Sequence, residues 1–370
     1  MTIISNKKDY IKWIDGLKAF ALILIVINSF NKYYLPLGYL GVDIFFVITG
    51  FVITLSLYKK NYHNFTNFIL SFFERRIYKL LPPLIFYVSI TSILTLLFLP
   101  QPKSELITGF SSLFGLSNIY LAKISLNYFK NNATLNPFIH TWAYGNLIQY
   151  YLIYPLIFYF TIGISRVKEQ KKLFNIILFL IIISLCNFVY FYSEKFSFAF
   201  YMIPSRFWEF GLGSLAYLLL INKSFIKKVS QINNSFLPSF ILLIYILIIF
   251  CFSSYPIFAT ISITFLTAIL LFSINDDSEI GEIFSLPILR HIGKLSFPLY
   301  LWHLAVISFS RHTIGIHWWT IPFQVLIIYL FGKFSSIYIE SPASLLNSSK
   351  KNPKNIKVIF LSMLGLMPFL

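Results

Sequence analysis

The stretch Gly41-Val42-Asp43-Ile44-Phe45-Phe46-Val47-Ile48-Thr49-Gly50-Phe51 lies at the centre of an apolar run over residues 37–57. A helix needs about 20 mostly apolar residues to cross the roughly 30 Å hydrocarbon core of a bilayer. The run is long enough, and its one ionisable residue is Asp43. A charged group inside a membrane is costly and usually has a partner. The stretch therefore predicts a membrane-spanning helix that carries a paired acid.

The composition extends this interpretation to the whole chain. The mean hydropathy is +0.75, 57% of the 370 residues are hydrophobic and only 12% are charged. That leaves too little polar surface for a water-soluble protein of this length. The net charge of +17 comes from short clusters of Lys and Arg between apolar runs. Such clusters favour membrane lipids as partners and argue against nucleic acid.

We expect an all-α, polytopic membrane helix bundle with about ten transmembrane helices and a truncated eleventh. The expected spans are residues 17–35, 37–57, 77–99, 144–164, 173–192, 204–221, 237–252, 255–274, 295–310, 318–338 and 358–370. A run interrupted by polar residues, 106–121, is expected to form one short re-entrant or surface helix. One membrane domain is expected over residues 1–340, followed over 341–370 by a cytoplasmic linker and the start of the last helix.

The Lys and Arg residues also predict the orientation of the helices. With the N-terminus in the cytoplasm, the loops on that side carry about three times as many Lys and Arg as the loops on the other side, as the positive-inside rule requires. The longest polar excursion, residues 100–140, then lies outside and is the expected lid or substrate loop. The two cysteines, Cys186 and Cys251, lie in apolar runs and predict neither a disulfide framework nor a metal site.

Six motifs follow one another in the order found in the membrane acyltransferase-3 family, which the chain resembles. They are Asp15-Gly16-Leu17-Lys18 with the stretch from Gly41 to Phe51, Glu74-Arg75-Arg76-Ile77-Tyr78-Lys79-Leu80-Leu81-Pro82, Pro137-Phe138-Ile139-His140-Thr141-Trp142 with Gln149-Tyr150-Tyr151, Arg206-Phe207-Trp208-Glu209, Ile292-Gly293-Lys294 through Trp302-His303, and Ile339-Glu340-Ser341-Pro342. The resemblance implies transfer of an acyl group, often acetyl from a cytoplasmic acyl-CoA, to a hydroxyl of a cell-surface glycan or glycolipid such as lipopolysaccharide. It also implies a bacterial inner (cytoplasmic) membrane and no permanently bound cofactor.

Two catalytic positions of the family are occupied differently in this chain. The resemblance implies a catalytic histidine at position 29 and paired glutamates just before Gln149, where the sequence has Ser29, Leu147 and Ile148. A serine hydroxyl cannot act as a base near neutral pH, and neither apolar side chain can orient an imidazole. Through the family mechanism, the chain is therefore expected to be slow or inactive.

Two histidines remain as candidates inside the bundle. His140 is the titratable group best placed to replace the missing base, and the family motif also has a histidine there. Its alternative role is structural, with the imidazole forming hydrogen bonds to the 100–140 loop. His303 follows Tyr300 and Trp302, where a packed, hydrogen-bonded histidine is the expectation.

Four basic residues are candidates for binding the phosphates of acyl-CoA. Arg75, Arg76 and Lys79 form a dense cluster at the expected cytoplasmic face, and Lys18 lies one turn into the first helix. Phosphate recognition favours such residues. The alternative is that the cluster anchors the protein to lipid headgroups and that Lys18 reaches the interface or forms an ion pair.

The remaining polar residues inside the membrane are expected to pair with one another. We expect Asp43 to pair with Lys18 and Glu209 to pair with Arg206, while Asp15 is another partner for Lys18. Gln149 is a further polar group in the expected fourth span. No spacing in the sequence is typical of a metal site.

Two hypotheses follow. The first is a membrane O-acyltransferase that works through a rearranged site, and the second is a catalytically impaired relative that serves as a binding or scaffold protein. Family members with the His140-type motif commonly continue into an extracytoplasmic SGNH-type hydrolase-fold domain. Since the sequence stops at Leu370, the resemblance implies that any such partner is a separate chain.

Overall fold

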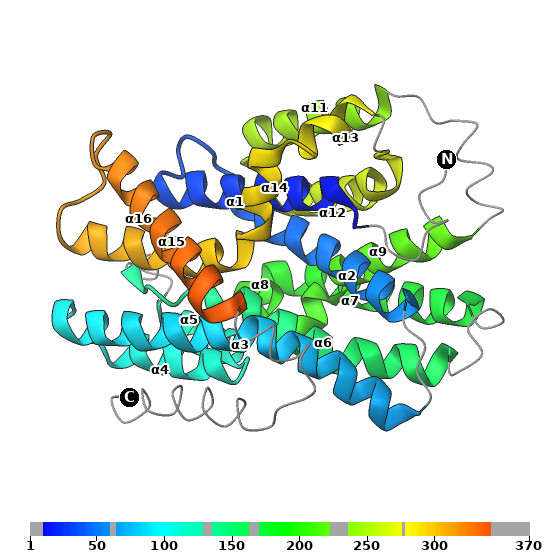
Figure 1. The fold of residues 1–370 in the computed structure, drawn as a ribbon, viewed down its shortest axis with the longest axis horizontal. Helices are drawn as coiled ribbons and strands as arrows, with labels where there is room; N and C mark the ends of the chain where they lie inside the picture. Colours follow the sequence, from blue (N-terminus) through cyan, green and yellow to red (C-terminus); the bar gives the residue numbers. More distant parts are fainter. Residues whose placement is uncertain are drawn as a thin grey trace. The chain divides into compact units, whose positions relative to one another are not determined.

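The computed structural model describes residues 10–59, 64–128, 135–162, 170–222, 236–275 and 278–341, and every regular element in these ranges is helical (Figure 1). The elements are α1 (Lys12–Phe30), η1 (Gly38–Leu40), α2 (Gly41–Lys59), α3 (Phe65–Phe98), α4 (Lys103–Leu113), α5 (Ser117–Tyr128), α6 (Thr141–Ile162), α7 (Gln170–Glu194), α8 (Phe196–Tyr201), α9 (Ile203–Ile221), α11 (Phe236–Cys251), α12 (Pro256–Ser273), α13 (Glu279–Phe284), α14 (Pro287–Lys294), α15 (Ser296–His312), α16 (Ile321–Phe334) and η3 (Ser335–Glu340). The all-α prediction is confirmed.

The chain divides into two compact units that interrupt each other in sequence. Unit 1 combines Met1–Asn61 with Tyr150–Ser296, and unit 2 combines Tyr62–Gln149 with Phe297–Leu370. Each unit therefore assembles from segments that are far apart along the chain. The expected last helix, over residues 358–370, lies outside the described residues.

Six helices in the described ranges are long and apolar enough to cross a membrane: α1, α2 with η1, α3, α7, α12, and α16 with η3. The pair α14 and α15, bent by 71°, would make a seventh. The expected count of about ten is therefore not confirmed, although a multi-pass membrane protein is. One reason is length, since α11 has 16 residues where a full span needs about 20.

The run over residues 106–121 does not form the single short helix that the sequence predicted. The chain breaks at Gly115, whose φ of 68° lies in the left-handed region that glycine adopts without strain. Helix α4 ends before this residue and α5 begins after it. Two helices therefore replace the predicted one.

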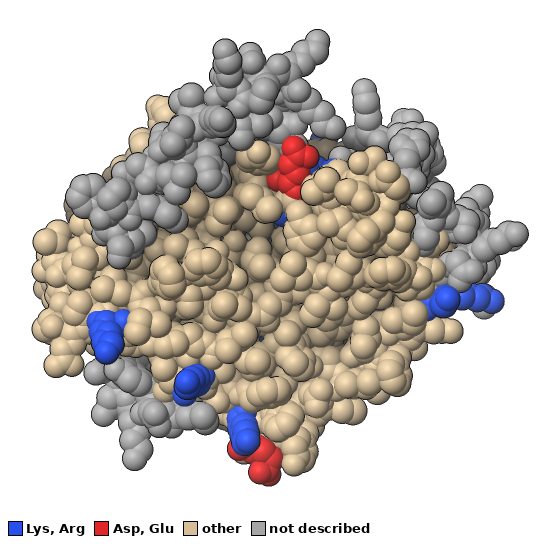
Figure 2. All heavy atoms as spheres, turned by 90° about the horizontal axis from the view of Figure 1, so that it is seen from below, with Lys and Arg blue, Asp and Glu red and all other residues tan. Residues whose placement is uncertain are grey.

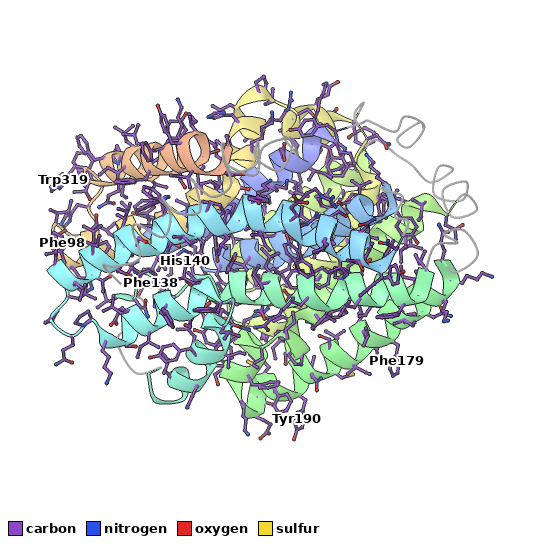
Figure 3. The ribbon with its side chains drawn as sticks, turned by 60° about the horizontal axis from the view of Figure 1, so that its bottom comes forward. Phe98, Phe138, His140, Phe179, Tyr190 and Trp319 are labelled. Carbon is purple, nitrogen blue, oxygen red and sulfur yellow. The ribbon has the colours of Figure 1, made fainter. Side chains whose placement is uncertain are left out.

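The outward-facing side chains of the spanning helices are apolar. On α7, Phe179 is 63% exposed and Tyr190 is 64% exposed, and Figure 3 shows both projecting away from the helices. The face drawn in Figure 2 carries few charged side chains among the described residues. Large apolar surfaces of this kind are unfavourable in water but match the hydrocarbon of a bilayer.

In unit 1, helix α2 packs tightly against α9 because both contribute glycine at their contact. A Cβ added to Gly50 would lie 1.8 Å from the carbonyl oxygen of Phe210, and one added to Gly213 would lie 1.8 Å from that of Val47. Small residues let membrane helices approach this closely. The approach brings the polar side chains near the start of each helix within reach of one another.

Unit 2 is built around the long helix α3 and a set of buried aromatic rings. The hydroxyl of Tyr87 on α3 donates to the carbonyl oxygen of Pro137 at 2.7 Å, which ties the segment before α6 to α3. The Tyr87 ring also packs against Phe138 and Trp302, with centroids 5.8 and 5.3 Å away. These contacts hold the start of α6 and the middle of α15 in one cluster.

Candidate functional site

Ser29, at the position where the family resemblance implies a histidine, lies near the end of α1. Its hydroxyl donates to the carbonyl oxygen of Ile25 at 2.8 Å. This bond to the preceding helical turn is common for serine in membrane helices, where it satisfies the hydroxyl. The geometry gives Ser29 a local structural role and does not change the conclusion that a hydroxyl is no base near neutral pH.

A neutral amide cluster occupies the segment where the family resemblance implies paired glutamates. The side-chain nitrogen of Asn118 on α5 donates to the side-chain oxygens of Asn146 and Gln149 on α6, each at 3.2 Å. Gln149 in turn donates to the carbonyl oxygen of Gly115 at 3.1 Å and to the side-chain oxygen of Asn118 at 2.9 Å. The sequence motifs include Gln149 but not Asn118, because nothing local pairs α5 with α6.

The amide cluster predicts a stability effect. Replacing Asn118 by leucine should destabilise the protein by about 1–3 kcal/mol, because the buried amide of Asn146 and the half-buried amide of Gln149 lose partners. Thermal unfolding in detergent measures this loss. The exposed Asn67 supplies the control, since Asn67→Leu removes no buried side-chain hydrogen bond. Equal unfolding temperatures for the two variants would contradict the prediction.

His140, labelled in Figure 3, lies in unit 2 immediately before α6, and aromatic side chains form a cage around it. The ring centroids of Tyr300, His303 and Tyr87 lie 5.1, 5.2 and 5.6 Å from its own. The hydroxyl of Tyr300 donates to the backbone carbonyl of His140 at 2.8 Å. The cage thus joins α3, α15 and the start of α6 around one imidazole.

The imidazole of His140 makes no hydrogen bond within the described part of the chain. Both ring nitrogens are buried without a partner, although backbone groups of Leu301 and Pro137 lie near enough to favour the charged ring. Burial, and then the neighbouring His303, outweigh them and hold the pKa of His140 well below its ordinary value. His140 is therefore neutral at pH 7, with a nitrogen available to accept a proton.

The sequence offered a structural role for His140, in which its ring holds the 100–140 loop through hydrogen bonds. Neither ring nitrogen forms a hydrogen bond of full geometry, but the backbone of Pro137 in that loop lies close enough to favour the charged ring, so the structural role stays a prediction. His303 agrees with expectation, being buried, with its Nδ1 within hydrogen-bonding distance of the carbonyl oxygen of Tyr300. That contact assigns the proton to Nδ1 and leaves Nε2 as the acceptor.

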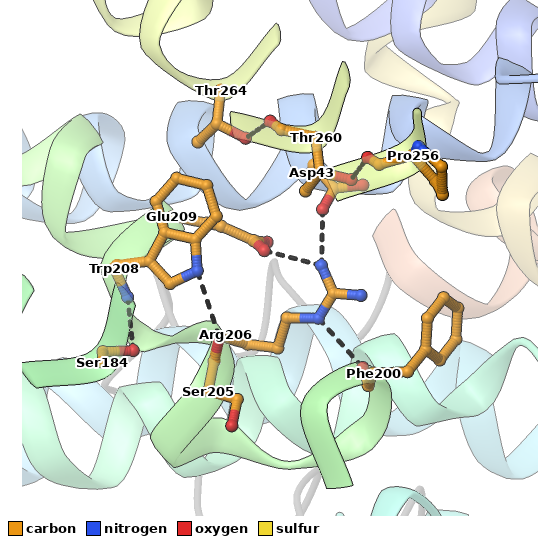
Figure 4. Close-up of polar contacts among 10 residues, drawn as sticks. All are labelled: Asp43, Ser184, Phe200, Ser205, Arg206, Trp208, Glu209, Pro256, Thr260 and Thr264. Atoms are coloured by element: carbon orange, nitrogen blue, oxygen red, sulfur yellow. Dashed lines mark hydrogen bonds and ion pairs between the residues drawn. The ribbon is translucent and has the colours of Figure 1, made fainter. Parts of the chain in front are cut away.

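A buried ion-pair triad forms in unit 1 between α2 and α9 (Figure 4). Nη1 of Arg206 donates to a carboxylate oxygen of Asp43 and to one of Glu209, each at 2.7 Å. Nε of Arg206 donates to the carbonyl oxygen of Phe200 at 3.0 Å, and the guanidinium lies 5.0 Å from that residue's ring centroid. All three charged residues are at most 3% exposed.

The triad corrects one predicted ion pair and confirms the other. Glu209 pairs with Arg206 as expected, but Asp43 also pairs with Arg206 and not with Lys18. Lys18 instead pairs with Asp15 at 3.0 Å. The physical reason is that Lys18 and Asp15 are one turn apart on α1, whereas the close α2–α9 packing delivers Arg206 to Asp43.

The remaining predicted binding residues are divided between the units. Arg75, Arg76 and Lys79 lie together on α3 in unit 2, with the Arg76 guanidinium 4.2 Å from the ring centroid of Phe72. Lys18 belongs to α1 in unit 1. Among the described residues, no group of three or more His, Cys, Asp or Glu could hold a metal ion.

Comparisons with known proteins agree with the motifs. Residues 11–340 match the family described as acyltransferase domain. The O-acetyltransferase OatA of Staphylococcus aureus is 30% identical over 353 residues, which cover 90% of this chain and 57% of that protein. A putative O-acetyltransferase of the same species is 32% identical over 356 residues, covering 91% of this chain and 58% of that protein.

The chain thus spans less than two thirds of the length of these curated relatives. No solved structure matches the chain significantly.

Proposed function

The chain belongs to the acyltransferase family, and on this premise we propose that it is a membrane O-acyltransferase that transfers an acetyl group from acyl-CoA to a hydroxyl of a cell-surface glycan or lipopolysaccharide. The similarity to O-acetyltransferases over about nine tenths of the chain supports the reaction type. The proposed location is a bacterial inner (cytoplasmic) membrane with the N-terminus in the cytoplasm. An SGNH-type hydrolase fold is the proposed partner of this membrane domain.

The observation that carries the proposal is the unpartnered imidazole of His140. An acceptor hydroxyl becomes a useful nucleophile when a base takes its proton, and neutral histidine is suited to that task at pH 7. Position 29 holds a hydroxyl and positions 147 and 148 hold hydrocarbon side chains. His140 is buried with both nitrogens free of hydrogen bonds and has a second imidazole beside it.

The reaction in this proposal has three parts. The proton of the acceptor hydroxyl passes to a ring nitrogen of His140, while the hydroxyl oxygen bonds to the acyl carbon of the thioester. The bond from that carbon to sulfur then breaks, and CoA leaves as the thiol after taking up the proton. Arg75, Arg76 and Lys79 are proposed to hold the CoA phosphates, because guanidinium and ammonium groups are suited to phosphate oxygens.

A second candidate function is that of an impaired relative that binds glycan, donor or partner without catalysis. Two observations favour it: the hydroxyl of Ser29 is bonded to its own helix, and a neutral amide cluster stands where the family has acids. Neither arrangement supplies a base. The two candidate functions differ in whether the unmodified chain catalyses acetyl transfer at all.

Restoring the family residues separates the candidates. The unmodified chain and a variant with Ser29→His and Ile148→Glu are purified in nanodiscs, and acetyl transfer from acetyl-CoA to glycan is measured. The proposal expects turnover by the unmodified chain that is unchanged in the control Ser29→Ala. Turnover found only in the repaired variant, about 10²- to 10⁴-fold above the unmodified chain as expected for a restored base, would overturn it in favour of the second candidate.

A further inference from the structure

A group of basic side chains that the mechanism above does not use surrounds Tyr10 in unit 1. Lys294 Nζ lies 5.4 Å from the ring centroid of Tyr10, and the guanidinium carbon of Arg290 lies 5.6 Å from it. The Tyr10 hydroxyl donates to one carboxylate oxygen of Asp15, and Lys18 donates to the other. One aromatic ring and one carboxylate therefore link three cations from α1 and α14.

The backbone brings these residues together by a very close crossing of α1 and α14. A Cβ added to Gly293 would lie 1.8 Å from the carbonyl oxygen of Asp15. Only glycine permits this approach. Arg290 and Lys294, on either side of Gly293 in sequence, are thereby held beside the first turn of α1.

The charges in this group do not cancel. Lys18 is the ion-pair partner of Asp15, whereas Arg290 and Lys294 form no salt bridge within the described part of the chain. Burial and the hydrogen bond to Asp15 raise the pKa of Tyr10, so its hydroxyl stays neutral. The group therefore carries a net charge of about +2 with several donors, and the Nε of Arg290 is buried without a hydrogen-bond partner.

We propose that Arg290 and Lys294, with Lys18 and Tyr10 beside them, form a phosphate-binding site. A dianionic phosphate would neutralise the two cations and accept a hydrogen bond from the Nε of Arg290. This phosphate group belongs either to CoA or to an anionic lipid headgroup. The assignment to CoA rests on the proposed function. The simpler explanation, that these cations only complement the C-terminus of α14, predicts no specific binding.

Binding measurements test the site without requiring turnover. The full chain is placed in nanodiscs of neutral phosphatidylcholine, and its affinity for CoA is measured by calorimetry at low salt. The variant is Arg290→Gln with Lys294→Gln. The matched control is Lys32→Gln, which removes a lysine 5.6 Å from the Tyr33 ring at the other end of α1. Unfolding temperatures establish that all proteins are folded.

A second arm distinguishes the lipid source. The same proteins are equilibrated, without CoA, with vesicles of phosphatidylcholine and phosphatidylglycerol, and the lipid that remains bound is determined by mass spectrometry. If CoA is the source, its affinity falls about tenfold or more in the double variant and is unchanged in the control. If a headgroup is the source, enrichment of phosphatidylglycerol is lost while CoA affinity stays the same.

The proposal is overturned if the double variant matches the control in both arms. That result would leave the proposed function intact, since acetyl transfer could still be observed. Conversely, a chain that binds CoA through these residues and transfers nothing would contradict the proposed function while retaining the phosphate site.

Discussion

Replacing Arg206 by methionine is expected to cost about 3–5 kcal/mol of folding free energy, because it leaves the carboxylates of Asp43 and Glu209 buried without a cation. The two acids have no solvent to stabilise their charge, and the close contact of α2 with α9 holds them near one another. Equilibrium unfolding in mixed micelles measures the change. The variant should unfold at a markedly lower denaturant concentration than the unmodified protein.

Two further variants test whether charge is the cause. Adding Asp43→Asn and Glu209→Gln to Arg206→Met removes both carboxylates and should restore most of the lost stability, since neutral side chains of similar shape remain. Glu209→Gln alone keeps the pair between Arg206 and Asp43 and should cost much less than Arg206→Met. If the triple variant is no more stable than Arg206→Met, packing and not charge explains the loss.

Replacing His140 by alanine is expected to lower acetyl transfer about 10²- to 10⁴-fold, the usual contribution of a general base. The comparison uses initial rates at saturating acetyl-CoA in nanodiscs. His312, at the exposed end of α15, provides the control, because it lies in the same unit but outside the aromatic cage. Comparable rates for His140→Ala and the unmodified protein would exclude His140 as the base.

The pH dependence of transfer adds a readout that a merely structural role would not change. Burial lowers the pKa of His140 in the folded protein, so the ring stays in its proton-accepting form as the pH falls through the range in which an exposed histidine becomes charged. The rate should therefore decline only when the pH approaches the lowered pKa. The free energy of unfolding should also decrease as the pH falls. Below about pH 6.5 the unfolded protein binds a proton at His140 more readily than the folded protein does, so protonation favours unfolding.

The helices could be predicted from local sequence because their signal is local. The apolar stretch around Phe46 predicts a spanning helix, and the structure has α2 there. The break at Gly115 could not be predicted in the same way, because glycine also occurs inside helices, as Gly50 does here. Whether glycine interrupts a helix or permits close packing depends on its neighbours in space.

The candidate sites could be predicted less well than the helices, because tertiary contacts bring their residues together. Sequence alone assigned Arg206 to Glu209 because the two are one helical turn apart, but Asp43 is 163 residues away and was assigned to Lys18. Likewise, the sequence gives no sign that Arg290 and Lys294 lie beside Tyr10, since that contact arises from a helix crossing. The family motifs located His140, whereas its lack of hydrogen bonds needed coordinates.

The interleaving of the two units has a consequence for biogenesis. A ribosome that adds about 5–20 residues per second completes Asp43 roughly 10–30 s before it completes the arginine that will neutralise it. During that interval the acid is inserted, or waits to be inserted, without its permanent counter-ion, which disfavours stable integration of its segment. Stable integration of α2 is therefore expected only after α9 has been synthesised and Arg206 can neutralise Asp43.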